Sequence, residues 1–246
     1  MMQLRRSNSL LPILLLIVIG VGLAGCIDLE SLKRELDRDR TSSSESLSVQ
    51  TISRGLKEAL RVASARASDQ ASVTGGYLNN AQIKIPLPDE LRDMAKTLRR
   101  LGLDEQVDEL EVALNRAAEL AATEAKPIFI NAIKSLTIED VVGIYKGDDS
   151  AATRYFERKT SSDLSRAFSP IVNNKLQQTG LARIYADLTA RYNALPFVKK
   201  PALDLGQYVT AGSLKGLFHL LAGEEAQIRR NPVARTTELL KTVFGS

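Results

Sequence analysis

Apolar residues recur at intervals of three and four along the 246-residue chain from Leu47 to its end. This spacing places them on one face of an α-helix, whereas a half-buried β-strand alternates apolar and polar residues. The stretch AQIKIPLP, residues 81–88, does alternate, but its two prolines favour an extended loop or edge piece. The pattern predicts an all-α fold over residues 47–246, a single-domain bundle of about eight amphipathic helices with proline kinks.

Short-range signals mark where these helices begin, bend and end. A proline suits the first helical position, a hydroxyl or carboxylate caps the first turn, and a glycine ends the last turn. The predicted starts are Pro88, Asp104, a capping box of Thr137 with Asp140, and Ser150. The predicted bends and ends are Gly102, Pro127, Gly147, Pro170 and Gly180.

A long helix is expected near the C-terminus, and Gly212, Gly216 and Gly223 fall on one side of it. Each glycine costs a helix ~1 kcal/mol relative to alanine, so we expect a neighbouring backbone to approach this side closely. Apolar residues between Leu205 and Ile228 lie on both sides, which predicts packing on two faces. The charged stretch EEAQIRR argues against a membrane span.

The N-terminus is organised differently. Arg5 and Arg6 precede an uncharged, mostly aliphatic stretch of 13 residues, 10–22. A spanning helix needs ~20 apolar residues, so this stretch is too short for one. A basic start, a short apolar stretch and small residues at its end are the parts of a signal peptide, which we place at residues 1–25.

The sequence LAGC, residues 23–26, resembles the lipobox of bacterial lipoproteins. The resemblance implies cleavage between Gly25 and Cys26, a diacylglycerol on the Cys26 thiol and a fatty acid such as palmitate on the new amine. Three acyl chains hold a protein stably on a membrane. In Gram-negative lipoproteins an aspartate directly after the cysteine favours the inner membrane. Here Ile27 takes that place and Asp28 follows, which predicts the outer membrane, facing the periplasm. The alternative to a lipobox is a plain N-terminal membrane anchor with an incidental cysteine.

A linker joins this cysteine to the helical region. Residues 26–46 carry charges of both signs and end in the serine-rich TSSSES. Such a composition is typical of a flexible tether, and 20 residues of flexible chain span roughly 25 Å. The tether would let the helical domain clear the lipid headgroups.

Composition excludes several classes of site. Without Arg5 and Arg6 the chain has 31 basic and 29 acidic residues, so it is nearly neutral and no nucleic-acid partner is expected. One histidine and one cysteine cannot form a His/Cys zinc site within one chain. Metal chemistry would have to rest on carboxylates, and we predict no metal and no cofactor.

Residues 147–164, GDDSAATRYFERKTSSDL, gather the most chemically active side chains. Arg154 could clamp an anion, and Tyr155 or Ser161 could serve as proton donor or nucleophile in a hydrolase-like site over residues 154–162. No base stands at a telling spacing, and G-x-S-x-G and S-x-x-K are absent. A helix cap followed by solvated charges is the favoured interpretation, and no catalytic residue is assigned.

His219 is followed by Glu224 and Glu225 five and six residues later. Side chains at that spacing do not share a helix face, so a packed or surface histidine is favoured over a metal ligand. Glu225 and Arg229, four residues apart, are expected to support the helix as an ion pair. Together the residues of interest for a ligand or partner surface are Arg154, Tyr155, His219, Glu224 and Glu225.

Several separated blocks are similar to one bacterial family of unknown function whose members are often predicted lipoproteins. They are GLKEAL, IPLPDELR, LNRAAELAA, EAKPIF, DDSAATRYFERKTS and GLFHLLAGEEAQIRRNPVARTTELLKTVFG. The similarity extends from near Leu47 to the C-terminus. It implies one helical domain in an envelope protein and transfers no site residues.

Three functions are compatible with these features. The favoured one is a membrane-tethered, non-catalytic binding or assembly module that contacts an envelope protein in the periplasm. The second is a carrier that holds an apolar ligand or lipid between its helices, because residues 205–228 have two apolar faces. The third is an enzyme that uses the 154–162 segment.

Overall fold

The computed structural model describes residues 47–178, 181–196 and 203–245. Across these residues the regular structure is helical and contains no β-strand, so the all-α prediction is confirmed. Residues 47–246 form one compact unit. The predicted signal peptide, Cys26, the tether and Gly180 lie outside the described residues.

The described helices follow one another along the chain, with the segment 73–88 between the first two. They are α2 (Val49–Ser72), α3 (Asp89–Arg100), α4 (Asp104–Ala122), α5 (Ala125–Lys134), α6 (Ile138–Tyr145), α7 (Ala151–Gln178), α8 (Leu181–Asn193), α9 (Leu205–Arg230), the 3₁₀ helix η1 (Pro232–Ala234) and α10 (Glu238–Phe244). None of the described helices combines the length and hydropathy that a membrane crossing requires.

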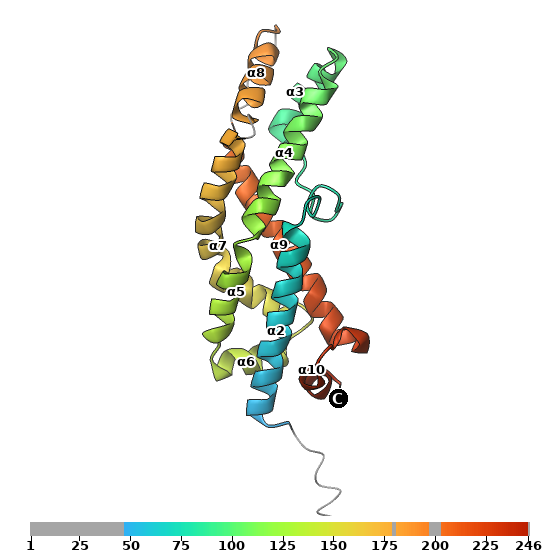
Figure 1. Ribbon diagram of the computed structural model, residues 1–246, viewed down its shortest axis with the longest axis vertical. Helices are drawn as coiled ribbons and strands as arrows, with labels where there is room; N and C mark the ends of the chain where they lie inside the picture. The colour runs from blue at the N-terminus through green and yellow to red at the C-terminus, as the bar shows by residue number, and fades with distance from the viewer. Residues whose placement is uncertain (1–46, 179–180, 197–202, 246) are drawn as a thin grey trace, which may run out of the picture. The chain divides into compact units, whose positions relative to one another are not determined.

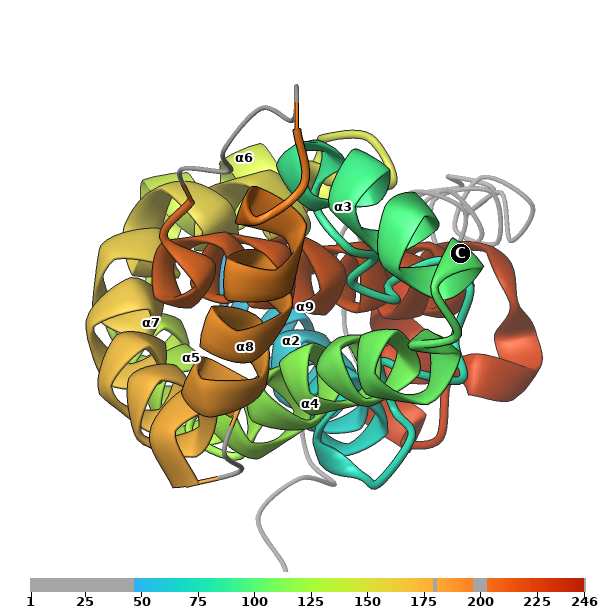
Figure 2. The same cartoon turned by 90° about the horizontal axis from the view of Figure 1, so that it is seen from above.

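Four long helices, α2, α4, α7 and α9, surround a common core (Figures 1 and 2). Helix α9 packs against the other three, which accounts for the apolar residues on both of its faces. Helices α6 and α10 lie at one end of the bundle, and α3 and α8 lie at the other (Figure 1). The prediction that α9 packs on two faces is confirmed.

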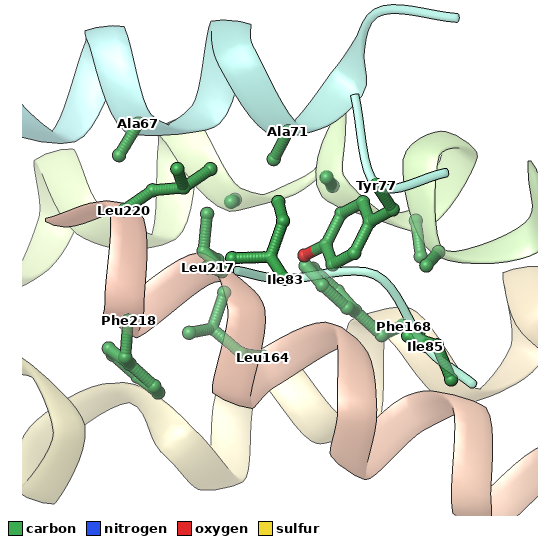
Figure 3. Close-up of a cluster of buried hydrophobic side chains, with 14 of the residues drawn as sticks. Ala67, Ala71, Tyr77, Ile83, Ile85, Leu164, Phe168, Leu217, Phe218 and Leu220 are labelled. Atoms are coloured by element: carbon green, nitrogen blue, oxygen red, sulfur yellow. The ribbon is translucent and has the colours of Figure 1, made fainter. Parts of the chain in front are cut away.

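The core is aliphatic at most positions and has an aromatic centre. The ring of Phe129 meets the rings of Phe156 and Phe218 edge to face, with centroids 5.3 and 6.2 Å apart. This geometry places the positive ring edge against the negative ring face and adds to the burial energy. Leu164 and Phe168 extend the cluster along α7 toward Tyr77 (Figure 3).

The segment 74–88 between α2 and α3 contacts both α4 and α9; its first part, residues 74–83, consists mostly of turns and its last part, residues 84–88, is extended. Ile83, Ile85 and Leu87 are buried and the residues between them are exposed, as on a β-strand. Its backbone pairs with a side chain instead of a strand: the Ile85 N–H donates to Asn115 Oδ1 at 2.8 Å, and Asn115 Nδ2 donates to the Ile85 carbonyl at 2.9 Å. The prediction of an extended loop for AQIKIPLP is confirmed.

Tyr77 anchors the same segment. Its side chain is fully buried, and its hydroxyl donates to the Ser213 carbonyl of α9 at 2.6 Å (Figure 3). Its backbone N–H donates to Glu119 of α4, which also pairs with Arg116 at 3.0 Å. Burial, followed by the Glu119 charge, raises the pKa of Tyr77. The buried polar groups of this junction therefore have partners.

The glycines of α9 have two different surroundings. A Cβ on Gly216 would lie 2.6 Å from Tyr77 Cε1, and a Cβ on Gly212 would lie 3.1 Å from Ile85 Cδ1. Close approach is thus confirmed at these two positions, but the approaching atoms belong to side chains and not to a helix backbone. The prediction was wrong for Gly223, because no atom lies within 4 Å of its Cβ position.

Most helix boundaries follow the predicted signals. Thr137 and Asp140 form the capping box at the start of α6, and Gly102 adopts the left-handed conformation after α3 with φ of 78°. Two starts are shifted by one residue: Pro88 is the N-cap of α3, and Asp104 is the first residue of α4.

The prolines also have different effects. Pro127 lies in the first turn of α5, and the chain breaks its helix just before it, at residues 123–124. Pro170 lies inside α7, which continues on both sides of it. A proline in a first helical turn removes no hydrogen bond, which explains why Pro127 is accommodated there.

Candidate functional site

The structure places the five residues of interest in separate surroundings. Arg154 and Tyr155, at the start of α7, line one groove between α6 and α7. His219 and Glu224 lie elsewhere on α9, and Glu225 is buried behind the first turn of α7. No single surface contains all five.

His219 and Glu224 connect α9 to neighbouring segments. His219 is exposed, and its Nε2 lies 3.3 Å from Gln82 Oε1 in the 74–88 segment. Glu224 accepts from Gln70 of α2 at 2.7 Å and pairs with Arg66 at 3.4 Å. These contacts hold α9 to its neighbours, and they show no arrangement typical of catalysis.

Glu225, a residue of α9, caps the N-terminus of α7. Its carboxylate accepts from the Ala152 N–H at 2.9 Å, the Thr153 N–H at 2.8 Å and the Thr153 hydroxyl at 2.8 Å. A carboxylate at a helix N-terminus satisfies free amides and interacts favourably with the helix dipole. The expectation that Ser150 would cap these amides was wrong, and Glu225, 5 % exposed, is not part of an open surface.

Arg229 completes this buried pair. Its Nε donates to Glu225 at 3.0 Å, and its other nitrogen donates to the Ile144 carbonyl near the end of α6 at 2.8 Å. The predicted ion pair between Glu225 and Arg229 is therefore present and does more than support α9. It fixes the end of α6 and the start of α7 to the same helix, and so sets the walls of the groove between them.

The groove between α6 and α7 is open and has a volume of about 310 Å³. Near its base the Tyr155 hydroxyl donates to Asp140 Oδ2 at 3.3 Å. The pKa of Asp140 is lowered, mainly because its carboxylate accepts a hydrogen bond from the Thr137 backbone N–H in the capping box. The lining residues are Glu139, Asp140, Gly143, Ile144, Gly147, Ala151, Arg154, Tyr155 and Arg158.

Arg154 already has partners at one end of the groove. It forms an ion pair with Asp148 at 3.0 Å and donates to the Ser150 hydroxyl at 2.5 Å. The hydrogen bond from Arg154, followed by those from Ser150, lowers the pKa of Asp148 to about 2. Arg154 is therefore held in position and partly neutralised.

Glu139 and Arg158 differ from the other charged groups of the groove. Both are exposed, and among the residues that the structure describes neither has a hydrogen-bond or ion-pair partner. Neither residue was among those predicted from the sequence. One signal was available, because Arg158 is four residues after Arg154 and shares its face of α7.

Gly143 has no side chain, so the part of the groove that α6 forms is open at this position. It lies inside α6, and no atom stands within 4 Å of its Cβ position. A helical glycine costs ~1 kcal/mol relative to alanine, and neither packing nor backbone geometry requires one here. The open space beside Gly143 is available to an external group.

Two candidate catalytic side chains of the 154–162 segment, Tyr155 and Ser161, take part in hydrogen bonds within the protein. Burial, followed by Asp140, raises the pKa of Tyr155, which keeps its hydroxyl protonated. Ser161 donates its hydroxyl to the Glu157 carbonyl within its own helix. Among the described residues, no three His, Cys, Asp or Glu side chains gather where they could hold a metal ion.

A second, smaller pocket bears on the carrier hypothesis. It is a small, partly open pocket among α2, α9 and α10 with a volume of about 20 Å³, bordered by Leu56, Leu60 and Leu221 among others. Ligand pockets have volumes of about 300 to 1,000 Å³, so this pocket does not accommodate a lipid chain.

Comparison with known proteins gives a family without a described activity. A family model described as a protein of unknown function, DUF4197, matches residues 46–245. Comparisons with curated proteins and with solved structures gave no match. The match covers the whole helical domain, including the groove, and the chain therefore belongs to the DUF4197 family.

Proposed function

We propose that this chain is a lipid-anchored envelope protein whose helical domain is a non-catalytic binding module, with the groove between α6 and α7 as its contact site. The lipid anchor would be attached at Cys26 and hold the domain at the periplasmic face of the outer membrane. The partner would be a component of the envelope.

One observation carries the binding proposal. The groove is open beside Gly143. It also contains two charged side chains, Glu139 and Arg158, that have no hydrogen-bond or ion-pair partner in the described part of the chain. An enzyme is less well supported, because Tyr155 and Ser161 are engaged in structural hydrogen bonds. An apolar carrier is also less well supported, because the pocket of about 20 Å³ is too small.

The anchor is supported by residues 1–28, where a basic start, a short apolar stretch and LAGC occur in the order of a lipoprotein signal. Metabolic labelling with a fatty acid tests it. The chain should incorporate the label, Cys26→Ser should not, and an inhibitor of lipoprotein processing should leave a larger precursor. An unlabelled wild-type chain would contradict the anchor.

Membrane separation tests the location. On a density gradient the wild-type chain should be found with the outer membrane. Ile27→Asp places an acid directly after Cys26 and should move the protein to the inner membrane. Finding both the wild-type chain and Ile27→Asp in the inner membrane would contradict the predicted location but not the proposed lipid anchor.

Site-specific crosslinking in cells tests the groove. A photoreactive residue at position 143 should form a discrete product whose partner is identified by mass spectrometry. Position 223 is the matched control, because both are helical glycines with no atom within 4 Å of the Cβ position. Equal capture at both positions, or capture at 223 alone, would contradict the groove as the contact site.

A further inference from the structure

The charges of the groove between α6 and α7 balance. Its lining holds two arginines, Arg154 and Arg158, and two acids, Glu139 and Asp140. A ligand of one sign would therefore meet both attraction and repulsion. The groove is unlike a phosphate or polyanion site, in which positive charge exceeds negative charge.

Two of these four charged groups have hydrogen-bond or ion-pair partners within the described part of the protein, and two do not. Arg154 is bound by Asp148, and Asp140 accepts from the Thr137 N–H and the Tyr155 hydroxyl. Glu139 and Arg158 have no hydrogen-bond or ion-pair partner in the described part of the chain and do not pair with each other. The groove thus presents one available carboxylate on α6 and one available guanidinium on α7.

The space between the two walls is partly apolar. Ile144 and Ala151 contribute to the lining, and Gly143 adds bare helix surface. The volume of about 310 Å³ lies at the lower end of the range of small-ligand sites, about 300 to 1,000 Å³, which leaves room for a dipeptide with small side chains.

We propose that the groove between α6 and α7 binds a small zwitterionic peptide, with its carboxylate at Arg158 and its ammonium group at Glu139. Arginine is suited to the carboxylate because its planar guanidinium can donate two parallel hydrogen bonds. Glu139 offers acceptors only, which suits an ammonium group. The proposal rests on the proposed function in one respect, since it takes the same groove as the contact site.

Calorimetric titration of the full chain in detergent tests the ligand chemistry. Dialanine carries both charges, N-acetyl-dialanine only the carboxylate, and dialanine amide only the ammonium group. Dialanine should bind, and each blocked form should bind at least about tenfold more weakly, because one ionic contact is lost. Equal binding of N-acetyl-dialanine and dialanine would overturn the proposal.

Variants locate the binding. Arg158→Gln and Glu139→Gln should each reduce dialanine affinity at least about tenfold. Arg166→Gln and Glu157→Gln are the matched controls, because both residues are exposed on α7 and neither lines the groove; they should leave the affinity unchanged. Dialanine binding that survives both groove variants would overturn the proposal.

Two other probes separate alternative ligands. Phosphoethanolamine is also zwitterionic but represents a lipid headgroup, and inorganic phosphate is a simple anion. Binding of either one without binding of dialanine would overturn the peptide assignment. If no dipeptide binds while position 143 still crosslinks specifically in cells, this inference fails and the proposed function stands.

Discussion

Two sets of charges lie on opposite sides of the junction between α6 and α7, and each contains one glutamate and one arginine. On the inner side, Glu225 and Arg229 are buried, and their hydrogen bonds reach α6, α7 and each other. On the outer side, Glu139 and Arg158 are exposed and have no partner among the described residues.

The difference follows from solvation. A buried charge costs several kcal/mol unless it is paired and hydrogen-bonded, so the inner set has to be complete for the fold to be stable. The outer set is hydrated and costs little when unpaired. The fold therefore requires the inner set and leaves the outer set free for contact with another molecule.

The largest effect is expected at the inner set. Glu225→Ala would leave Arg229, whose side chain is 10 % exposed, and two amides of α7 without their acceptor. We expect a loss of about 3 to 5 kcal/mol in the free energy of unfolding, measured by urea denaturation.

Its sequence neighbour provides the control. Glu224→Ala removes a carboxylate that is 15 % exposed and bound to Gln70 and Arg66. Arg66 is 36 % exposed and can be hydrated in the variant, so the loss should be about 1 kcal/mol. Equal losses for Glu224→Ala and Glu225→Ala would show that the buried network does not have the special role assigned to it.

A smaller loss is expected where α9 meets the 74–88 segment. Gly216→Ala places a Cβ 2.6 Å from Tyr77 Cε1, and Tyr77 is held by its bond to Ser213. Overpacking of this kind costs about 1 to 3 kcal/mol, which thermal or urea unfolding would detect. An unchanged unfolding free energy would mean that Tyr77 moves freely, contrary to its hydrogen bonding.

The sequence predicts the helices better than their contacts. The capping box of Thr137 and Asp140 and the left-handed Gly102 are local features, so a few neighbouring residues determine them. The cap of α7 is not local, because Glu225 is 73 residues from Ala152. No spacing rule connects residues so far apart.

The polar groups of α4 show a signal that was present but not interpreted. Asn115 and Glu119 lie four residues apart among the buried alanines and leucines of the helix. Polar residues on an apolar face require buried partners, and both of these residues bind the 74–88 segment. The outer charges were missed for a different reason, since Glu139 and Arg158 look like any solvated pair until the groove is visible.

A local electrostatic effect is expected at the edge of the groove. The hydrogen bond from Arg154, together with those from Ser150, lowers the pKa of Asp148 to about 2 from its ordinary 3.8. Because the pKa is lower in the folded chain, these contacts stabilise the fold at pH values above the ordinary pKa of the Asp148 carboxyl. This stability is lost as the pH falls toward about 2.

Removal of the guanidinium tests this effect. In Arg154→Gln the pKa of Asp148 should rise toward 3.8 but remain below it, because the hydrogen bonds from Ser150 persist. An NMR titration of the Asp148 carboxyl carbon in both proteins would measure the change. An identical pKa in the two proteins would contradict the contact.

The most direct test of the groove between α6 and α7 uses Gly143, one of its lining residues. Gly143→Ala and Gly223→Ala both add a methyl group where no atom lies within 4 Å, so each should raise the free energy of unfolding by up to ~1 kcal/mol. Dialanine titration should then separate them: Gly143→Ala should weaken binding by obstructing the groove, and Gly223→Ala should not. Unchanged dialanine affinity in Gly143→Ala would contradict the groove as a binding site.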